Sequence, residues 1–105
     1  FVIALGSYRE LPDEAILAAD HLVVDQVEQC LQRGTLADAA DRGAVTADDI
    51  DATIGAVLTD GYDVEIGSDD SKLFVPIGLG ALDVALAERI HRNGATTGIS
   101  EFAFV

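Results

Sequence analysis

The stretch His21-Leu22-Val23-Val24-Asp25 decides the fold class. It is short and largely apolar, β-branched at its centre, and ends on an acid, which predicts a strand over residues 21–25. Residues 26–33 follow with apolar side chains at helical spacing, and Gly34 is a usual residue just after a helix end. A strand followed at once by a helix is the repeating unit of a parallel sheet.

The chain before this unit predicts another strand and helix. Residues 1–5 form a continuous apolar run closed by Gly6 and Ser7, as expected of a buried parallel strand that ends in a loop. Pro12 and the two acids after it suit a first helical turn, so we expect a short helix that runs to Ala19.

The chain after this unit continues the alternation. Residues 36–42 predict one or two helical turns on the surface, and Thr46 begins a predicted helix whose apolar face runs to Gly61. Residues 72–76 predict a strand stopped by its own proline, and residues 81–93 carry an apolar stripe typical of a final helix. This order predicts one α/β domain with a parallel sheet, helices packed against it, and ligands beyond the carboxyl ends of the strands.

The charge of the chain excludes two classes of partner. Nineteen acids against six bases give a formal charge of −13, and the bases are scattered singly. Such a field repels phosphate backbones and anionic surfaces, so we expect neither nucleic acid nor a membrane as partner. The acidic excess also suits a protein adapted to high salt.

Cysteine and histidine usage argues against disulfides and metal sites. A single cysteine, Cys30, excludes an internal disulfide, so the expected compartment is the cytoplasm, and its place on an apolar helix stripe predicts a small buried hydrophobe. We expect His21 and His91 at the surface or an edge without a metal, and Asp69-Asp70 as a solvated pair. The chain begins without Met, which predicts that a preceding segment has been removed.

Eight short blocks of the sequence are similar, in their order and spacing, to a known family. They resemble the ornithine cyclodeaminase / mu-crystallin family over nearly the whole chain. The blocks are Ala4-Leu5-Gly6-Ser7-Tyr8, Arg9-Glu10-Leu11-Pro12, Ala19-Asp20, Val23-Val24-Asp25, Gly34-Thr35-Leu36, Ile54-Gly55-Ala56-Val57-Leu58, Ser68-Asp69-Asp70 and Phe74-Val75-Pro76-Ile77-Gly78-Leu79-Gly80-Ala81-Leu82-Asp83.

The resemblance implies part of an NAD(P)-dependent oxidoreductase that acts on a small amino or imino acid. Residues 1–105 would be the C-terminal portion of a Rossmann-like NAD(P)-binding domain, with a closing helix over 80–93 and a tail over 94–105. The cofactor would be NAD or NADP. The family also implies a homodimer formed through a missing N-terminal part, and the fragment alone is expected to be inactive.

The resemblance also implies site residues. Backbone groups of Val2, Ile3, Ala4 and Leu5 would lie against the nicotinamide side of the cofactor, and Gly6 would leave room for its approach. The loop after Phe74 would lie opposite, with Pro76 at the cofactor and Ile77 near the substrate. Tyr8 would be the catalytic residue, as a donor of a proton or hydrogen bond to an imine nitrogen.

Three departures from the family narrow the expected reaction. Tyr8 stands where cyclodeaminases have a catalytic Asp, and a tyrosine, with an ordinary pKa of about 10, is not a carboxylate base. The loop between Tyr8 and Arg9 is shorter than in the family, and Pro76 replaces a frequent Ser. We therefore expect a ketimine reductase or amino-acid dehydrogenase type of enzyme. The alternatives are a non-catalytic ligand-binding protein of the mu-crystallin type and an inactive fragment.

Overall fold

Four short parallel strands form the centre of the described part of the molecule. The computed structural model describes residues 1–59, 62 and 67–94. In sheet order the strands are β1 (Val2–Ile3), β4 (Lys72–Val75), β2 (His21–Val24) and β3 (Ala52–Thr53). The last strand in the sequence therefore lies between β1 and β2, and it pairs with both in parallel. The predicted α/β class with a parallel sheet is confirmed.

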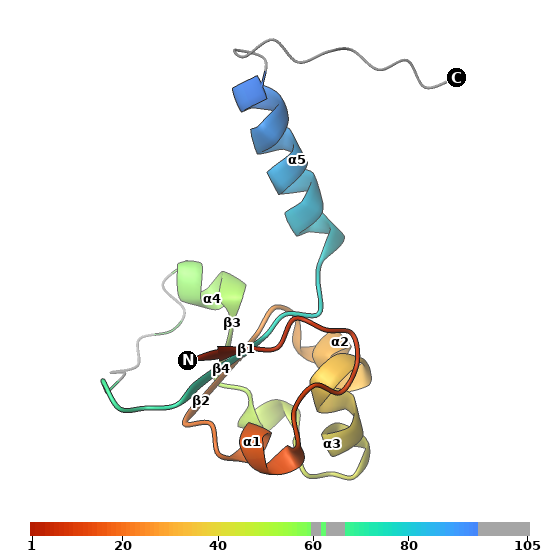
Figure 1. Cartoon of the computed structure of the whole chain (residues 1–105), viewed down its shortest axis with the longest axis vertical. Helices are drawn as coiled ribbons and strands as arrows, with labels where there is room; N and C mark the ends of the chain where they lie inside the picture. Colours follow the sequence, from red (N-terminus) through yellow and green to blue (C-terminus); the bar gives the residue numbers. More distant parts are fainter. Residues whose placement is uncertain (60–61, 63–66, 95–105) are drawn as a thin grey trace.

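The helices of the body are short and lie mostly on one side of the sheet (Figure 1). None of the described helices is long and apolar enough to cross a membrane. The α-helices are α1 (Asp13–Leu17), α2 (Val27–Gln32), α3 (Ala37–Asp41), α4 (Ile54–Leu58) and α5 (Gly80–Gly94), and the 3-10 turns are η1 (Gly34–Leu36) and η2 (Ala47–Asp49).

The two faces of the sheet differ in burial. In β2 and β4 every second residue is buried, so one face carries Leu22, Val24, Leu73 and Val75. This face packs on buried side chains of α1, α2, η1, α3 and the following loop, namely Ile16, Cys30, Leu36, Ala39 and Val45. The opposite face carries His21, Val23, Lys72 and Phe74, which are only half-buried. The core therefore lies on one side of the sheet.

The prediction of a buried first strand is wrong. Strand β1 covers only Val2 and Ile3 at the edge of the sheet, with a neighbour on one side, β4. Phe1, Val2 and Ile3 are 80%, 49% and 47% exposed. A continuous apolar run gives the same sequence pattern for an edge strand and a central strand, so the pattern alone cannot place it.

The prediction of one helix from Thr46 to Gly61 is also wrong. The Asp49 carboxylate accepts hydrogen bonds from the backbone and hydroxyl of Thr46, so the predicted helix start is present, but only as the turn η2. Ala52 and Thr53 then pair with β2 as strand β3, and α4 begins after it. Pairing with a neighbouring strand has overridden the helical spacing of the apolar residues.

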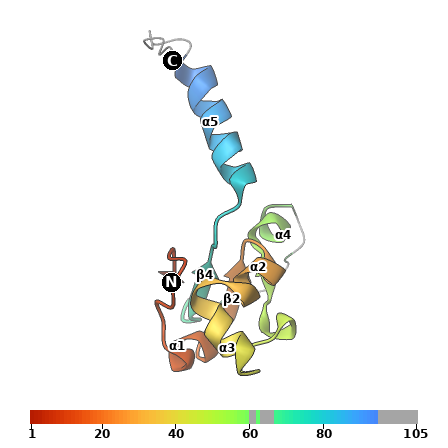
Figure 2. The same ribbon diagram turned by 90° about the vertical axis from the view of Figure 1, so that its right-hand side faces the viewer.

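Two helical elements, residues 36–42 and α5, have surroundings that differ from the predictions. The turns over residues 36–42 lie at the surface with one face only: Asp38, Asp41 and Arg42 are exposed, whereas Leu36 and Ala39 are fully buried in the core. The final helix, predicted over 80–93, occurs as α5 over Gly80–Gly94, yet it does not pack against the sheet. Figures 1 and 2 show α5 projecting from the body at the end of a single extended connection. The tail after residue 94 lies outside the described residues.

Candidate functional site

Three connections meet at the carboxyl edge of the sheet. Because the strands are parallel, the segments after β1, β2 and β4 all leave from the same edge. The Ala4 N–H donates to the Phe74 carbonyl at 3.0 Å, so the segments that follow β1 and β4 start side by side. The expectation that the loop after Phe74 lies opposite the first strand is therefore replaced by direct adjacency.

Asp25 holds the connection after β4 in place. Its side chain follows β2 and the residue is only 6% exposed. One carboxylate oxygen accepts the Gly78 N–H at 2.7 Å, and the other accepts the Gln26 N–H at 2.8 Å. The backbone of Ile77 also donates to this carboxylate. Asp25 thus fixes the direction in which the chain leaves β4.

The protonation states around Asp25 follow from these contacts. Burial of Asp25 disfavours its charged form, but the hydrogen bonds from Ile77, Gly78, Cys30 and Gln26 outweigh burial and lower the pKa of the carboxyl below its ordinary value. Burial raises the pKa of the Cys30 thiol, and the nearby Asp25 raises it further. The prediction that Cys30 is a small buried residue is confirmed, and the thiol is held in its neutral form.

Glycines allow the loops at this edge to approach closely. Gly34 has a φ of +79°, and a Cβ placed on it would lie 2.6 Å from Cδ1 of Ile77 and 3.4 Å from the carbonyl oxygen of Gly6. A side chain at position 34 would therefore push these loops apart. Gly34 thus brings the predicted cofactor and substrate residues, Gly6 and Ile77, to the same place.

Buried Thr35 anchors the loop after β1. The residue is 1% exposed, and its hydroxyl accepts the Glu10 N–H at 2.8 Å and lies 3.5 Å from the Tyr8 carbonyl. The Glu10 carboxylate in turn accepts the Gly6 N–H at 2.8 Å. The loop that carries Gly6 and Tyr8 is therefore fastened at both ends to buried or hydrogen-bonded groups.

The predicted site residues divide into two groups. Ala4, Gly6, Pro76 and Ile77 lie at the carboxyl edge and are buried or half-buried. Val2, Ile3, Leu5 and Tyr8 belong to the same segment after or within β1, but their side chains are exposed to solvent, with Tyr8 83% exposed. The structure thus places Val2 and Ile3 beside Leu73 and Phe74 within the sheet, brings Gly6 and Ile77 together at Gly34, and leaves the Tyr8 ring outside this group.

His21 was predicted at the surface or an edge, but it lies half-buried on the inner strand β2. Its side chain is 11% exposed, with Nδ1 2.9 Å from the Tyr62 hydroxyl and Nε2 3.0 Å from an Asp70 carboxylate oxygen. Asp70 is therefore a hydrogen-bonded partner rather than a solvated acid. Among the described residues, His, Cys, Asp and Glu side chains form no group that could hold a metal ion.

Sequence reasoning missed Asp25, Gly34 and Thr35 as parts of this edge. The sequence did contain a signal for Asp25, because an acid directly after a buried parallel strand lies at the ligand-binding end of the sheet. Gly34 was assigned only to the end of a helix. Thr35 had no distinguishing pattern, because its role depends on the distant backbone of Glu10.

This parallel sheet with its loops at the carboxyl edge is an α/β fold that matches part of Rossmann-type enzymes. The archaeal "alanine dehydrogenase dimer w/bound NAD" superimposes with a TM-score of 0.78 and 29% identity, over 98% of this chain and 33% of that one. Thermococcus litoralis Δ1-pyrroline-2-carboxylate reductase, whose structure is "in complex with NADH and L-proline", has a TM-score of 0.77 over 90% of this chain and 29% of that one. Its 21% identity supports the fold alone.

Sequence comparison points to the same relatives. Alanine dehydrogenase from Archaeoglobus fulgidus is 30% identical over 94 residues, which are 90% of this chain and 29% of that enzyme. Δ1-pyrroline-2-carboxylate reductase from Bacillus thuringiensis subsp. konkukian is 26% identical over 103 residues, or 93% of this chain and 32% of that enzyme. No protein-family model matches the chain.

These findings confirm the predicted resemblance. The chain is a distant homologue of alanine dehydrogenase and Δ1-pyrroline-2-carboxylate reductase, which are members of the ornithine cyclodeaminase / mu-crystallin family. It spans about a third of the length of these relatives.

Proposed function

We propose that this chain is the nicotinamide-side part of an NAD(P)-dependent oxidoreductase that acts on a small amino or imino acid. The observation that carries the proposal is the close approach of Gly6 and Ile77 to Gly34 at the carboxyl edge of a parallel sheet, where α/β proteins bind nucleotides. Homology to an alanine dehydrogenase and an imino-acid reductase supports the substrate class. An amino-acid dehydrogenase or ketimine reductase reaction fits best, because Tyr8 replaces a catalytic carboxylate.

The residues present fit a dinucleotide at this edge. Gly6 has no side chain, Ala4 has a small one, and the adjacent Pro76 offers no N–H, so the backbone of residues 2–6 can approach a flat ring closely. When bound, nicotinamide would accept or donate the hydride. Residues 2–6 and Pro76 would hold the ring, and the Asp25 carboxylate would keep the opposing loop fixed.

Ile77 and Tyr8 have separate proposed roles on the substrate side. Ile77 would present an apolar surface to the substrate and exclude water beside the reacting carbon. Tyr8 would donate its hydroxyl proton to the imine nitrogen as that nitrogen becomes an amine. Asp25 is not proposed as a catalytic residue, since backbone N–H groups already occupy both of its oxygens.

A second candidate function is ligand binding without catalysis, as in mu-crystallin. The exposure of the Tyr8 ring favours it, because no other described residue forms a hydrogen bond with its hydroxyl to orient it. A dimer formed through a preceding segment is still a prediction. The same holds for the expectation that only a longer protein has catalytic activity. Turnover of a cyclic imine or of L-alanine separates the two candidates.

Cofactor titration tests the proposal. NADH and NADPH would be titrated by fluorescence into the 105-residue chain and into the product of the complete reading frame that encodes it, in low and in molar salt. We expect saturable binding of one dinucleotide by the complete product. Gly6→Ala should weaken binding at least tenfold, since a Cβ at position 6 would lie 2.5 Å from the Glu10 carboxylate and would displace the loop proposed to hold the ring.

Gly80→Ala is the matched control. Position 80 has open space around a Cβ and begins α5. This substitution should leave dinucleotide affinity unchanged. Equal effects of the two substitutions, or no binding by a folded complete product in either salt, would overturn the proposed cofactor role.

A further inference from the structure

The large side chains of the loop after β1 do not hold it in place. Leu5 and Tyr8 both point into solvent, with exposed fractions of 75% and 83%. They therefore bury little apolar surface that could fix the loop. Because Gly6 of this loop is proposed to approach the cofactor, the position of its backbone depends on other contacts.

One buried hydroxyl group reaches this loop from the turn that follows α2. Thr35 lies in η1 and is 1% exposed. Its hydroxyl accepts the Glu10 N–H at 2.8 Å and lies 3.5 Å from the Tyr8 carbonyl oxygen. The Glu10 carboxylate accepts the Gly6 N–H at 2.8 Å. These contacts, from Thr35 through Glu10 to Gly6, are called the Thr35 brace below, and they connect the core to the backbone of Gly6.

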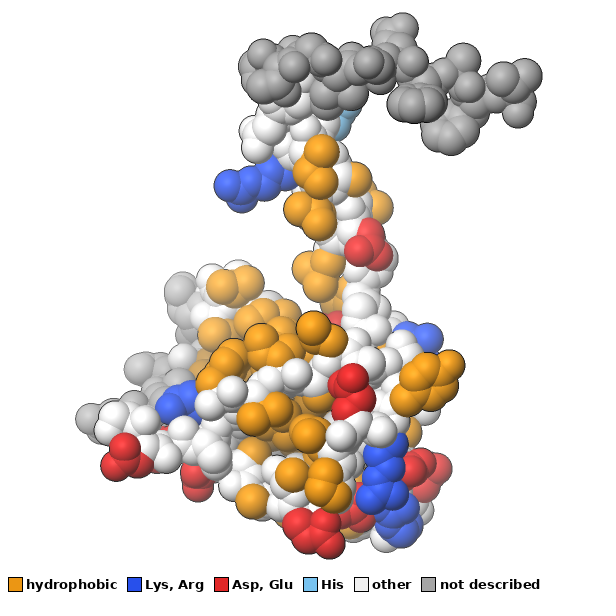
Figure 3. All heavy atoms as spheres, viewed as in Figure 1, with side chains coloured by type: hydrophobic (Ala, Val, Ile, Leu, Met, Phe, Trp, Pro, Cys, Tyr) orange, Lys and Arg blue, Asp and Glu red, His pale blue; other side chains and the backbone are white. Residues whose placement is uncertain are grey.

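Ion pairs at the surface also reach the loop but hold it more weakly. Arg9 lies 3.2 Å from an Asp13 carboxylate oxygen and 3.6 Å from an Asp38 carboxylate oxygen. Figure 3 shows such basic and acidic side chains side by side on the surface of the body. Exposed pairs contribute little, because water and salt screen them. The contact with buried Thr35 is the stronger constraint, because breaking it leaves polar groups that water reaches less easily.

The residue before Thr35 extends the same turn to the loop after β4. A Cβ on Gly34 would lie 2.6 Å from Cδ1 of Ile77 and 3.4 Å from the carbonyl oxygen of Gly6. The backbone of Gly34 therefore packs against both loops at the carboxyl edge. A shift of Thr35 would move Gly34 with it and change the spacing between Gly6 and Ile77.

We propose that Thr35 and Glu10 are positioning residues, which hold the Gly6 backbone where it approaches the nicotinamide ring. This inference rests on the proposed cofactor role of the carboxyl edge. The Thr35 hydroxyl faces Glu10 and Tyr8 and is not offered to a ligand, so it would act only through the loop. Glu10 would act as a hydrogen-bond acceptor, and its charge would not be required.

Substitutions at Thr35 separate the hydroxyl from the shape of the side chain. Thr35→Val keeps the shape and removes the hydroxyl, whereas Thr35→Ser keeps the hydroxyl. In the product of the complete reading frame, we expect Thr35→Val to raise the dissociation constant of NADH or NADPH on the order of tenfold, because the loop is no longer held in its binding position. Thr35→Ser should stay within about twofold of the wild type. An unchanged dissociation constant for folded Thr35→Val would overturn the proposal.

Glu10 provides a second pair of variants at an exposed position, where substitution threatens folding less. Glu10→Gln keeps a side-chain oxygen that can accept the Gly6 N–H, whereas Glu10→Ala removes it. We expect Glu10→Ala alone to weaken dinucleotide binding, by about fivefold. If Glu10→Gln weakens binding equally, the charge of Glu10 matters and the hydrogen bond of the brace does not.

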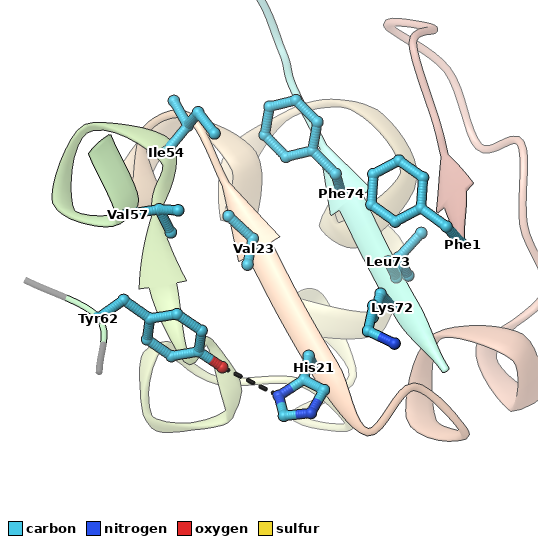
Figure 4. Close-up of a pocket in the computed structure, with 9 residues that line it drawn as sticks. All are labelled: Phe1, His21, Val23, Ile54, Val57, Tyr62, Lys72, Leu73 and Phe74. Atoms are coloured by element: carbon cyan, nitrogen blue, oxygen red, sulfur yellow. Dashed lines mark hydrogen bonds between the residues drawn. The ribbon is translucent and has the colours of Figure 1, made fainter. Parts of the chain in front are cut away.

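A polar cluster at the other edge of the sheet controls for loss of stability alone. His21 begins β2, and its Nδ1 lies 2.9 Å from the Tyr62 hydroxyl (Figure 4) while Nε2 lies 3.0 Å from Asp70. His21→Leu removes both contacts at the amino edge, away from the loops after β1 and β4. It should lower the free energy of unfolding, as Thr35→Val does, and leave dinucleotide affinity unchanged. Equal weakening of binding by both variants would show that stability, and not the position of the loop, controls affinity.

Hydrogen exchange examines the brace without any cofactor. In the same products, Thr35→Val should accelerate exchange of the Gly6 and Glu10 amides roughly tenfold. The Ala56 amide, which donates to the Thr53 hydroxyl, should keep its rate. Unchanged exchange at Gly6 and Glu10 would overturn the brace. If exchange changes as expected but the wild-type product binds neither dinucleotide, the proposed cofactor role fails, and the positioning role that depends on it fails with it.

Discussion

The body of the molecule and helix α5 carry the same kind of apolar periodicity but use it differently. In the body, Cys30 and Ala39 turn toward the sheet and are fully buried. In α5, Leu82 and Leu86 follow an equally regular stripe and remain more than half exposed. The difference teaches that periodicity identifies which face of a helix will be covered, whereas the connecting loop decides which surface can cover it.

Truncation of a core leucine should show the largest difference between these regions. Leu36 is the last residue of η1 and is fully buried in the core, so Leu36→Ala should lower the free energy of unfolding by about 2–5 kcal/mol through lost burial and a residual cavity. Leu86→Ala should change it by less than about 0.5 kcal/mol, because that side chain is more than half exposed. Urea unfolding followed by circular dichroism measures both. A comparable loss for Leu86→Ala would mean that α5 belongs to the core.

Asp25→Asn tests the connection between β4 in the body and helix α5, which Asp25 holds in place. The amide keeps the shape but removes the charge that binds the N–H groups of Gln26 and Gly78, so we expect a loss of about 1–3 kcal/mol at neutral pH. The same substitution should broaden amide resonances of the connection to α5. Unchanged stability and unchanged resonances would contradict the role assigned to this carboxylate.

The difference in stability between the wild-type chain and Asp25→Asn should change with pH in a defined direction. The pKa of Asp25 is lower in the folded chain than in the unfolded chain, so its contribution is fully present above the unfolded value and disappears as the pH falls through the folded value. The advantage of the wild-type chain over Asp25→Asn should therefore be constant near neutral pH and shrink below about pH 4. An advantage that grows on acidification would contradict this linkage.

The smallest expected effect concerns the boundary between β3 and α4. The Thr53 hydroxyl accepts the Ala56 N–H at 3.2 Å and caps the helix, so Thr53→Ala should cost about 1 kcal/mol of unfolding free energy. Thr59→Ala is the control, because that hydroxyl donates to the Gly55 carbonyl at the exposed end of the same helix. Thermal unfolding should rank the cap substitution as the more damaging.

The sequence predicted the central strands well because their patterns are local. Residues 21–25 and 72–76 were each expected as a strand and occur as β2 and β4. Strand β3 could not be found in this way, since Ala52 and Thr53 are extended only because they pair with Val23 and Val24. The exposure of β1 likewise depends on its place in the strand order, which no short pattern encodes.

The location of the candidate site could be predicted from the sequence, but the contacts that hold its loops in place could not. The adjacency of the segments after β1 and β4 follows from the carboxyl edge of a parallel sheet, and the resemblance supplied the residue numbers. The contact of Gly34 with Ile77 and the hydrogen bond from Glu10 to Thr35 join segments 43 and 25 residues apart. Such contacts depend on how whole elements pack, so a single sequence does not reveal them.

The strand order also determines when the molecule can fold during synthesis. Strand β4 lies between β1 and β2 and supplies the pairing partner for both, although it ends at residue 75. Until the ribosome has released this segment, β1 and β2 lack the strand that they share, and the core face of β2 lacks Leu73 and Val75. Because Val2 pairs with Leu73, the sheet closes through contacts that are distant in sequence, which slow folding and expose strand edges to aggregation. The nascent chain is therefore most vulnerable just before β4 emerges.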